Sequence, residues 1–323
     1  MNDHQPKEER PYLQATIADC HEAWFRPMGF QLRIVSNSRA AIEAAEASFG
    51  LFGPAVPWGA PDLAFHLYEH EIDDGATGNP IFRIEGPLVY QTTGRDSVLV
   101  ADRARGLAYG YFSRTTLEDP AFFRWHFLDL ALFFMLEWRG FLGVHGAAIC
   151  KNGRALLLRG PSGQGKSTLT YAGARDRFQA LAEDVVWIGS NNDLWWGIPS
   201  SFHLLPDAKE LFPELRSHRA LVQLNGERKM PVDLRRVRPG SVVTSGRPGP
   251  VVMMRRIPGR ACRLEKLALD HAFGEWLSGC ATKEQEATDY ERKVFSLLRC
   301  GAYRLHFGDD IDQALDLLEP LFD

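Results

Sequence analysis

The stretch GPSGQGKST, residues 160–168, constrains the fold of this chain more than any other. It fits the pattern G-x-x-x-x-G-K-[ST], whose fixed positions hold Gly160, Gly165, Lys166 and Ser167. The apolar run 155–159 before it predicts a buried strand, and residues 166–174 predict a helix. Because the pattern is informative only between a strand and a helix, the sequence predicts a P-loop (Walker A) here.

A P-loop binds phosphate groups because its glycines let backbone N–H groups curl around phosphate oxygens, next to a helix N-terminus. Lys166 supplies charge for the terminal phosphates, and the Ser167 hydroxyl can bind Mg²⁺. We predict that the whole loop contacts a nucleotide: Gly160, Pro161, Ser162, Gly163, Gln164, Gly165, Lys166, Ser167 and Thr168. A serine-hydrolase elbow, G-x-S-x-G, is excluded because Gln164 stands at its second glycine.

An acidic pair follows the predicted P-loop helix. Residues 178–182 predict a short strand that ends at Glu183-Asp184, and residues 185–188 predict the next strand. A carboxylate at a strand end beside a P-loop is well placed to bind Mg²⁺, directly or through water. The alternative is a pair of solvated turn residues.

Composition limits the classes of function. A hydrophobic content of 45% and a charged content of 24% predict a soluble globular protein, and the net charge of −4 argues against a general nucleic-acid binder. No apolar run approaches the roughly 18 residues of a membrane span, and the polar N-terminus does not resemble a signal peptide. The five dispersed cysteines indicate a reducing compartment. We therefore expect a cytoplasmic protein without a membrane or nucleic-acid partner.

The hydrophobic patterns divide the chain into three parts. Residues 1–20 predict a flexible tail. Residues 21–115 predict an α+β region, in which five short strands between residues 62 and 112 indicate an antiparallel sheet. Residues 116–323 predict the P-loop domain with helices at its C-terminal end.

One motif in the first region suggests a metal site. His66, Glu69 and His70 fit the zinc pattern H-x-x-E-H, but that pattern binds zinc only on a helix. The neighbouring residues predict a strand instead, so we interpret the histidines as polar residues of a half-exposed strand.

Two further patterns concern the connection into the P-loop domain. Residues 120–139 predict a long helix with one apolar face, formed by Phe123, Phe127, Leu130, Phe134 and Trp138. Asn152-Gly153 predicts a tight hairpin turn just before the P-loop strand. The sheet that carries the P-loop is therefore expected to be partly antiparallel.

The arginine-rich segment 235–250 predicts either a mobile loop or a substrate loop.

The order of histidine, P-loop and acidic pair resembles the HPr kinase/phosphorylase family, and more closely its relatives called HPr-kinase-related kinases. His145-Gly146 precedes Lys166 by 21 residues, the interval in that family, and the acidic pair follows at the family's spacing. Glu183 stands where those enzymes usually have the first of two aspartates. The similarity is strongest over residues 143–188.

The resemblance implies an α/β fold with a mixed sheet, an HPr-kinase C-terminal-domain-like P-loop core and a smaller N-terminal antiparallel α+β region. It also implies a kinase that uses ATP and Mg²⁺. In the matching positions, Lys166 and the loop amides would hold the ATP phosphates, and Ser167 and Asp184 would hold Mg²⁺. Glu183 would be the catalytic base, with His145 close to the acidic pair. Lys229 resembles a basic residue that relatives place near the transferred phosphate.

The family's E-x-R-G-x-G signature is absent after the acidic pair. We therefore do not predict reverse phosphorylase activity, HPr as the substrate or a hexamer. Whether the chain forms another homo-oligomer stays an open question. We predict a serine kinase that acts on a peptide or small protein. The alternatives are a kinase of a small-molecule hydroxyl, a plain ATPase, and a nucleotide-binding regulatory or scaffold module that transfers no phosphoryl group.

Overall fold

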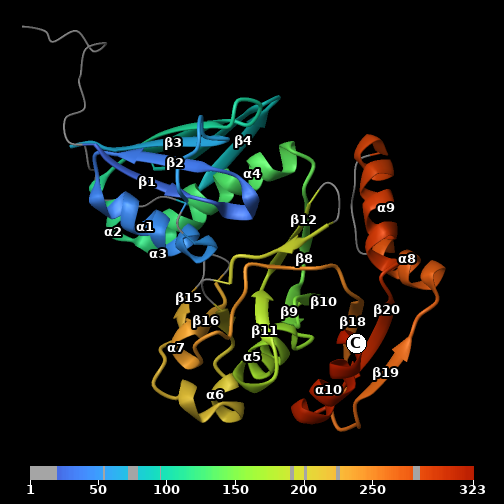
Figure 1. Ribbon diagram of the computed structural model, residues 1–323. Coiled ribbons are helices and arrows are strands. Elements are labelled where there is room, and N and C mark those ends of the chain that lie inside the picture. Colours follow the sequence, from blue (N-terminus) through green and yellow to red (C-terminus); the bar gives the residue numbers. More distant parts are fainter. Residues whose placement is uncertain are drawn as a thin grey trace, which may run out of the picture. The chain divides into compact units, whose positions relative to one another are not determined.

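The computed structural model describes residues 20–53, 55–71, 79–94, 96–189, 193–199, 202–222, 226–278 and 284–323. The chain forms two compact units, within residues 1–131 and 132–323 (Figure 1). The predicted flexible tail lies outside the described residues except for Cys20. Asn191-Asn192, which the sequence predicts to be a hairpin turn between two apolar runs, lies outside them as well.

In the first unit, seven strands form one sheet in the order β1-β2-β3-β7-β6-β5-β4. The strands are β1 (His21–Phe25), β2 (Leu32–Ser36), β3 (Leu63–Glu69), β4 (Ile81–Glu85), β5 (Leu88–Thr93), β6 (Ser97–Asp102) and β7 (Leu107–Phe112). The helices are α1 (Arg39–Phe49), α2 (Arg114–Glu118) and α3 (Pro120–Phe123), and 3₁₀ turns span Pro27–Gly29 and Gly50–Phe52.

The sheet of the first unit is mixed, which corrects the prediction of an antiparallel sheet. β2 pairs in parallel with β3, and β3 in parallel with β7, whereas the remaining neighbours are antiparallel. The chain returns through α1 to the end of the sheet where β2 began, as a parallel pair requires. The spacing of short strands indicated that they exist but not which of them become neighbours.

The H-x-x-E-H segment lies on β3 and just after it, as predicted. The His66 ring stacks on Tyr109 at 4.8 Å between centroids, and Glu69 accepts a hydrogen bond from Arg114 at 3.0 Å. Across the described parts of the chain, no group of three or more His, Cys, Asp or Glu residues is placed to hold a metal ion. The strand interpretation is confirmed.

The long helix predicted for residues 120–139 forms, but with an irregular centre. α3 continues through a π-helical segment, Arg124–Asp129, into α4 (Leu130–Trp138). The wider π turn shifts the later residues around the helix axis. Phe123 and Phe127 are fully buried, whereas Trp138 is 47% exposed and does not continue their face, which corrects the predicted apolar stripe.

Asp129, at the end of the π turn, is buried in the first unit, and its Oδ1 atom has no hydrogen-bond partner among the described residues. Burial raises its pKa from 3.8 to about 6, although the Arg124 charge and the Ser48 hydroxyl oppose the shift. A raised carboxyl pKa stabilises the fold at low pH, and this stabilisation is lost as the pH rises through about 6. Asp129 therefore destabilises the first unit near neutral pH.

We expect Asp129→Asn to stabilise the first unit, by an amount that grows by roughly 2–3 kcal/mol between about pH 4 and pH 7. The amide cannot ionise, so the cost of burying a charge disappears. Hydrogen exchange of peptides from β2 and β3 measures this, because it reports on the first unit alone. Glu118→Gln, an exposed acid nearby, is the control. If the stability difference between Asp129→Asn and the native protein did not change with pH, the raised pKa of Asp129 would be contradicted.

The described residues of the second unit form three sheets, in the orders β11-β9-β10-β18-β20-β19, β17-β13-β12-β8 and β14-β16-β15. The strands are β8 (Leu142–His145), β9 (Ala147–Lys151), β10 (Arg154–Arg159), β11 (Gln179–Ala182), β12 (Val185–Ile188), β13 (Trp195–Trp196), β14 (Phe202–Leu204), β15 (Leu221–Val222), β16 (Arg228–Val232), β17 (Ser245–Gly246), β18 (Val251–Arg256), β19 (Arg263–Lys266) and β20 (Ala302–Phe307).

The helices of the second unit that follow α4 are labelled in Figure 1. They are α5 (Lys166–Asp176), α6 (Ala208–Leu211), α7 (Leu234–Val237), α8 (Leu269–Ser278), α9 (Glu284–Leu298) and α10 (Ile311–Leu318), with 3₁₀ turns at Pro213–Leu215 and Glu319–Phe322. In α10 the side chain of Asp310 caps the N-terminus by accepting a hydrogen bond from the Gln313 amide at 2.9 Å. Segment 235–250, predicted to be a loop, contains the short elements α7 and β17.

The six-stranded sheet carries the strand that precedes the P-loop sequence. β9 and β10 form the predicted antiparallel hairpin, and Asn152 and Gly153 both have positive φ, at 52° and 73°, as a tight type I′ turn requires. β10 then pairs in parallel with β18, and β18 with β20. The expected mixture of parallel and antiparallel pairs is confirmed, and with it the α/β class. The assignment to an HPr-kinase-like core stays a prediction.

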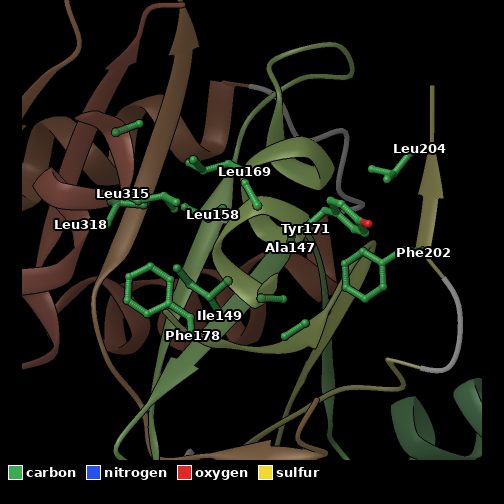
Figure 2. Packing of buried hydrophobic residues seen from close by; sticks show 14 of the residues in the cluster. Ala147, Ile149, Leu158, Leu169, Tyr171, Phe178, Phe202, Leu204, Leu315 and Leu318 are labelled. Atoms are coloured by element: carbon green, nitrogen blue, oxygen red, sulfur yellow. The ribbon is translucent and has the colours of Figure 1, made fainter. Parts of the chain in front are cut away.

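The helix that follows the loop is fixed by the core of the second unit. Figure 2 shows Leu169 of α5 close to Leu158 of β10 and to Leu315 of α10. Residues 169–174 of α5 are buried without interruption. A helix held on so many sides keeps its N-terminus in a fixed place relative to β10.

Candidate functional site

The loop between β10 and α5 has the backbone shape that its glycines permit. Gly163 and Gly165 have φ values of 79° and 87°, in the left-handed region, and Gly165 leads directly into α5. The Lys166 ammonium folds back over the loop and donates to the carbonyl oxygens of Gly160 at 2.7 Å and Pro161 at 3.0 Å. The loop therefore curls around the end of its own lysine.

Lys166 is only 8% exposed. Burial lowers the pKa of its ammonium group, and the nearby carboxylates of Asp184 and Glu183 act in the opposite direction. The site thus combines a partly desolvated cation with two anions close enough to act on its pKa. Electrostatic interactions in such a site are stronger than on an open surface.

Glu183 and Asp184 lie where the chain passes from one sheet to another. Glu183 follows β11 of the six-stranded sheet, and Asp184 precedes β12 of the four-stranded sheet. β8 and β9 make the same passage at Gly146, whose amide donates to the Asp184 carbonyl at 2.8 Å. Two crossings of the chain therefore meet beside the P-loop sequence.

The two carboxylates have different partners. The Ser167 hydroxyl donates to Glu183 Oε1 at 3.1 Å, and Nδ1 of His203 lies 3.2 Å from Glu183 Oε2. Only 12% of the Glu183 side chain is exposed. The sequence predicts Ser167 and Asp184 as Mg²⁺ ligands, and this stays a prediction; the Ser167 hydroxyl itself contacts Glu183.

Asp184 pairs with His145, whose Nδ1 lies 3.0 Å from Asp184 Oδ1, and both side chains are more than half exposed. The hydrogen bond from His145 holds the pKa of Asp184 below its usual value, and the charges of Lys229 and Lys166 contribute in the same direction. His145 faces Val185 across the pair β8–β12, so the sheet register fixes it beside the acidic pair. Asp184 therefore stays ionised at neutral pH.

Lys229 lies on β16 and forms an ion pair with Glu227 at 3.1 Å. Its charge also lowers the pKa values of Asp184 and Lys166, so it belongs to the same electrostatic cluster. The structure thus brings six predicted site residues close to one another: Lys166, Ser167, Glu183, Asp184, His145 and Lys229. Their functional roles stay predictions.

The other predicted loop residues divide by exposure. Pro161, Ser162 and Gly163 are exposed, and Thr168 is half-buried in the first turn of α5. Gln164 accepts a hydrogen bond from the Arg256 amide at 2.6 Å, which ties the loop to the end of β18.

His203 is the residue of this site that sequence analysis missed. It lies on β14 between the buried residues Phe202 and Leu204. A polar residue between two apolar ones in a short strand indicates only that its side chain leaves the core face. Its contact with Glu183 depends on the packing of β14 near α5, which no local pattern reveals.

Gly165 should tolerate substitution less well than Gly163. A Cβ atom at Gly165 would lie 2.6 Å and 2.9 Å from two ring carbons of Phe307, whereas one at Gly163 would meet nothing within 4 Å. We expect Gly165→Ala to lower the free energy of unfolding by roughly 2–4 kcal/mol and Gly163→Ala by only about 1–2 kcal/mol, the backbone contribution alone. Urea unfolding of both variants measures the difference. Equal losses would show that Phe307 does not constrain the loop.

Comparisons with known proteins identify no family for this chain. No model of a protein family matches it, and no curated protein matches it. Among solved structures, the HPr(Ser) kinase/phosphatase from Coxiella burnetii matches with a TM-score of 0.28 and 13% sequence identity. The match covers 56% of this chain and 93% of that one. The likeness is weak.

Proposed function

We propose that this chain is an ATP- and Mg²⁺-dependent kinase that transfers the γ-phosphoryl group to a hydroxyl, that of a serine in a peptide or small protein. The observation that carries the proposal is the meeting of Lys166, at the start of α5, with the carboxylates of Glu183 and Asp184 beside one glycine-rich loop. A phosphoryl-transfer site needs this combination of a phosphate cradle, a cation and oxygen donors.

The loop fits the phosphates of a nucleotide. The first hydrogen bond within α5 runs from the Leu169 amide to the Gly165 carbonyl at 2.9 Å. The amides of Lys166, Ser167 and Thr168 therefore have no partner inside the helix. Together with the helix dipole and the Lys166 charge, these amides favour a bound polyanion.

The oxygen donors also fit Mg²⁺. This ion is usually bound by one or two carboxylates together with substrate phosphates, and not by a complete set of protein ligands. The Ser167 hydroxyl and the Asp184 carboxylate, which stays ionised because its pKa is lowered, would hold it. When bound, Mg²⁺ neutralises charge on the phosphates.

Glu183 is the residue that we assign as the base. Its carboxylate lies between the Ser167 hydroxyl and the His203 ring, which fix its orientation from both sides. Asp184 is a weaker base because its pKa is lowered. Glu183 would accept the proton of the acceptor hydroxyl, while Lys166 and Lys229 hold the anionic groups in place.

Label transfer from γ-labelled ATP tests the proposal. The native protein and Mg²⁺ are incubated with a soluble extract of cells that produce the protein naturally, which is then separated into protein, peptide and small-molecule fractions. We expect label in one peptide or protein species. Label in a small molecule would redirect the proposal to that acceptor class. Tight nucleotide binding without any labelled product would favour a regulatory module, and rapid release of phosphate without an acceptor would favour an ATPase.

A further inference from the structure

A basic pocket lies in the second unit, between the segment that contains α6 and the start of β16. Its volume is about 480 Å³, and its charged lining consists of Lys209, Arg216, Arg219 and Arg228, next to His218. All of these residues lie between positions 206 and 228. Figure 1 shows α6, β15 and β16, which carry or flank them.

The described residues offer the cations of the basic pocket no anionic partner. No ion pair joins any of the four to a carboxylate within the described chain, and no carboxylate lines the pocket. The Nδ1 atom of His218 is buried and, among the described residues, has no hydrogen-bond partner. Because the whole chain has a net charge of −4, four cations that the described residues leave without an ion pair at one pocket are a local feature that favours an anionic ligand.

The surroundings of the basic pocket favour a peptide over a small anion. Leu205 precedes the lining residue Pro206, and Leu221 and Val222 follow the lining residue Ala220. These three side chains are 45%, 54% and 68% exposed. Apolar side chains beside a cationic pocket suit a ligand that presents both acidic and apolar groups.

The basic pocket is linked to the candidate site by two short strands. Arg228 precedes Lys229 on β16, and the charge of Lys229 lowers the pKa of Asp184. Pro206 follows His203 of β14 by three residues, and His203 contacts Glu183. At ~3.3 Å per residue, three residues of extended chain span about 10 Å.

We propose that the basic pocket docks an acidic segment of the acceptor peptide, about three to six residues from the hydroxyl that receives the phosphoryl group. That the docked peptide is the phosphoryl acceptor rests on the proposed function, whereas the binding of an acidic peptide does not. The pocket thus assigns a substrate class: peptides with glutamate or aspartate and a nearby apolar side chain.

Equilibrium binding without ATP tests the pocket. Fluorescence anisotropy compares labelled synthetic peptides that contain one serine, two leucines and four residues that are Glu, Gln or Lys. We expect the Glu peptide to bind at least about tenfold more tightly than the Gln peptide, and this preference to weaken with salt. The double variant Arg219→Ser/Arg228→Ser should weaken Glu-peptide binding by roughly tenfold.

The matched control is Lys266→Ser/Arg299→Ser, which removes two other exposed cations that are unpaired among the described residues. Equal weakening in the two double variants, or equal binding of the Glu and Gln peptides, would overturn the inference. A third result would also overturn it: citrate displaces the Glu peptide, and replacing the two leucines of the peptide does not change its affinity. A small anion would then be the occupant of the basic pocket. Melting curves establish that both variants fold.

The same variants separate this inference from the kinase proposal. If the Glu peptide binds through the pocket but no peptide is labelled by γ-labelled ATP, the docking site stands and the kinase proposal fails. If Glu and Gln peptides are phosphorylated with equal kcat/KM, the kinase proposal stands and the docking site fails. A fluorescent nucleotide should bind the double variant as it binds the native protein, because the pocket lies outside the phosphate loop.

Discussion

Lys166→Ala is expected to weaken ATP binding by about 30-fold to 1,000-fold and to remove detectable phosphotransfer. The substitution deletes a buried cation at the start of α5, and charge-assisted hydrogen bonds to phosphate contribute roughly 2–4 kcal/mol together. Displacement of a fluorescent nucleotide measures the affinity, and label transfer measures the activity.

Lys266→Ala is the control, because it removes an exposed lysine from an edge strand of the same unit. Lys166 also donates to the Gly160 and Pro161 carbonyls, so the loop itself could change. Lys166→Arg keeps the charge and so separates the loss of charge from a change in the loop. We expect this variant to bind ATP more tightly than Lys166→Ala. Native ATP affinity in Lys166→Ala would contradict the assignment of the phosphate site.

Glu183→Gln is expected to lower kcat by roughly 10²-fold to 10⁴-fold while the affinity for ATP changes little. Glutamine has nearly the same shape and still offers an oxygen to the Ser167 hydroxyl, which lies 3.1 Å from Glu183 Oε1. It cannot accept the proton of an acceptor hydroxyl. Single-turnover label transfer at saturating ATP measures the loss directly.

Asp184→Asn is the matched comparison. Its main expected effect is a higher Mg²⁺ concentration for half-maximal activity, because Asp184 is the more exposed of the two carboxylates and its pKa is lowered, chiefly by the His145 hydrogen bond. If excess Mg²⁺ restores Glu183→Gln but leaves Asp184→Asn inactive, the two roles are reversed. His203→Gln should lower kcat less than Glu183→Gln does, since His203 only orients the base.

Local patterns predicted most of the elements that carry the site. Strand, glycine loop and helix follow one another without a gap at residues 154–176, and the Asn152-Gly153 turn has the positive φ values that these residue types favour. The acidic pair lies at a strand end, as its apolar neighbours indicated. Each of these features depends on residues close together in the sequence.

The features that the sequence did not predict depend on distant residues. The parallel pairing of β3 with β7 joins strands separated by a long run of hairpin residues. The contact between His203 and Glu183, at 3.2 Å, joins β14 to the residue that follows β11, a strand of another sheet. The π turn before α4 breaks a helical period that is otherwise regular in the sequence. Packing, and not local preference, decides all three.

The division of the acidic pair between two sheets has a mechanical consequence. Glu183 follows β11 and contacts Ser167 of α5, whereas Asp184 precedes β12 and contacts His145 of the antiparallel pair β8–β12. Because Glu183 and Asp184 are consecutive, one peptide bond connects the two sheets, and a relative displacement of the sheets would change the distance between the two carboxylates. The hydrogen bond from the Gly146 amide to the Asp184 carbonyl continues the β8–β12 ladder to the point where both chain segments cross between the sheets, and it holds the two crossings together. Hydrogen exchange of the Gly146 amide would report how often this junction opens.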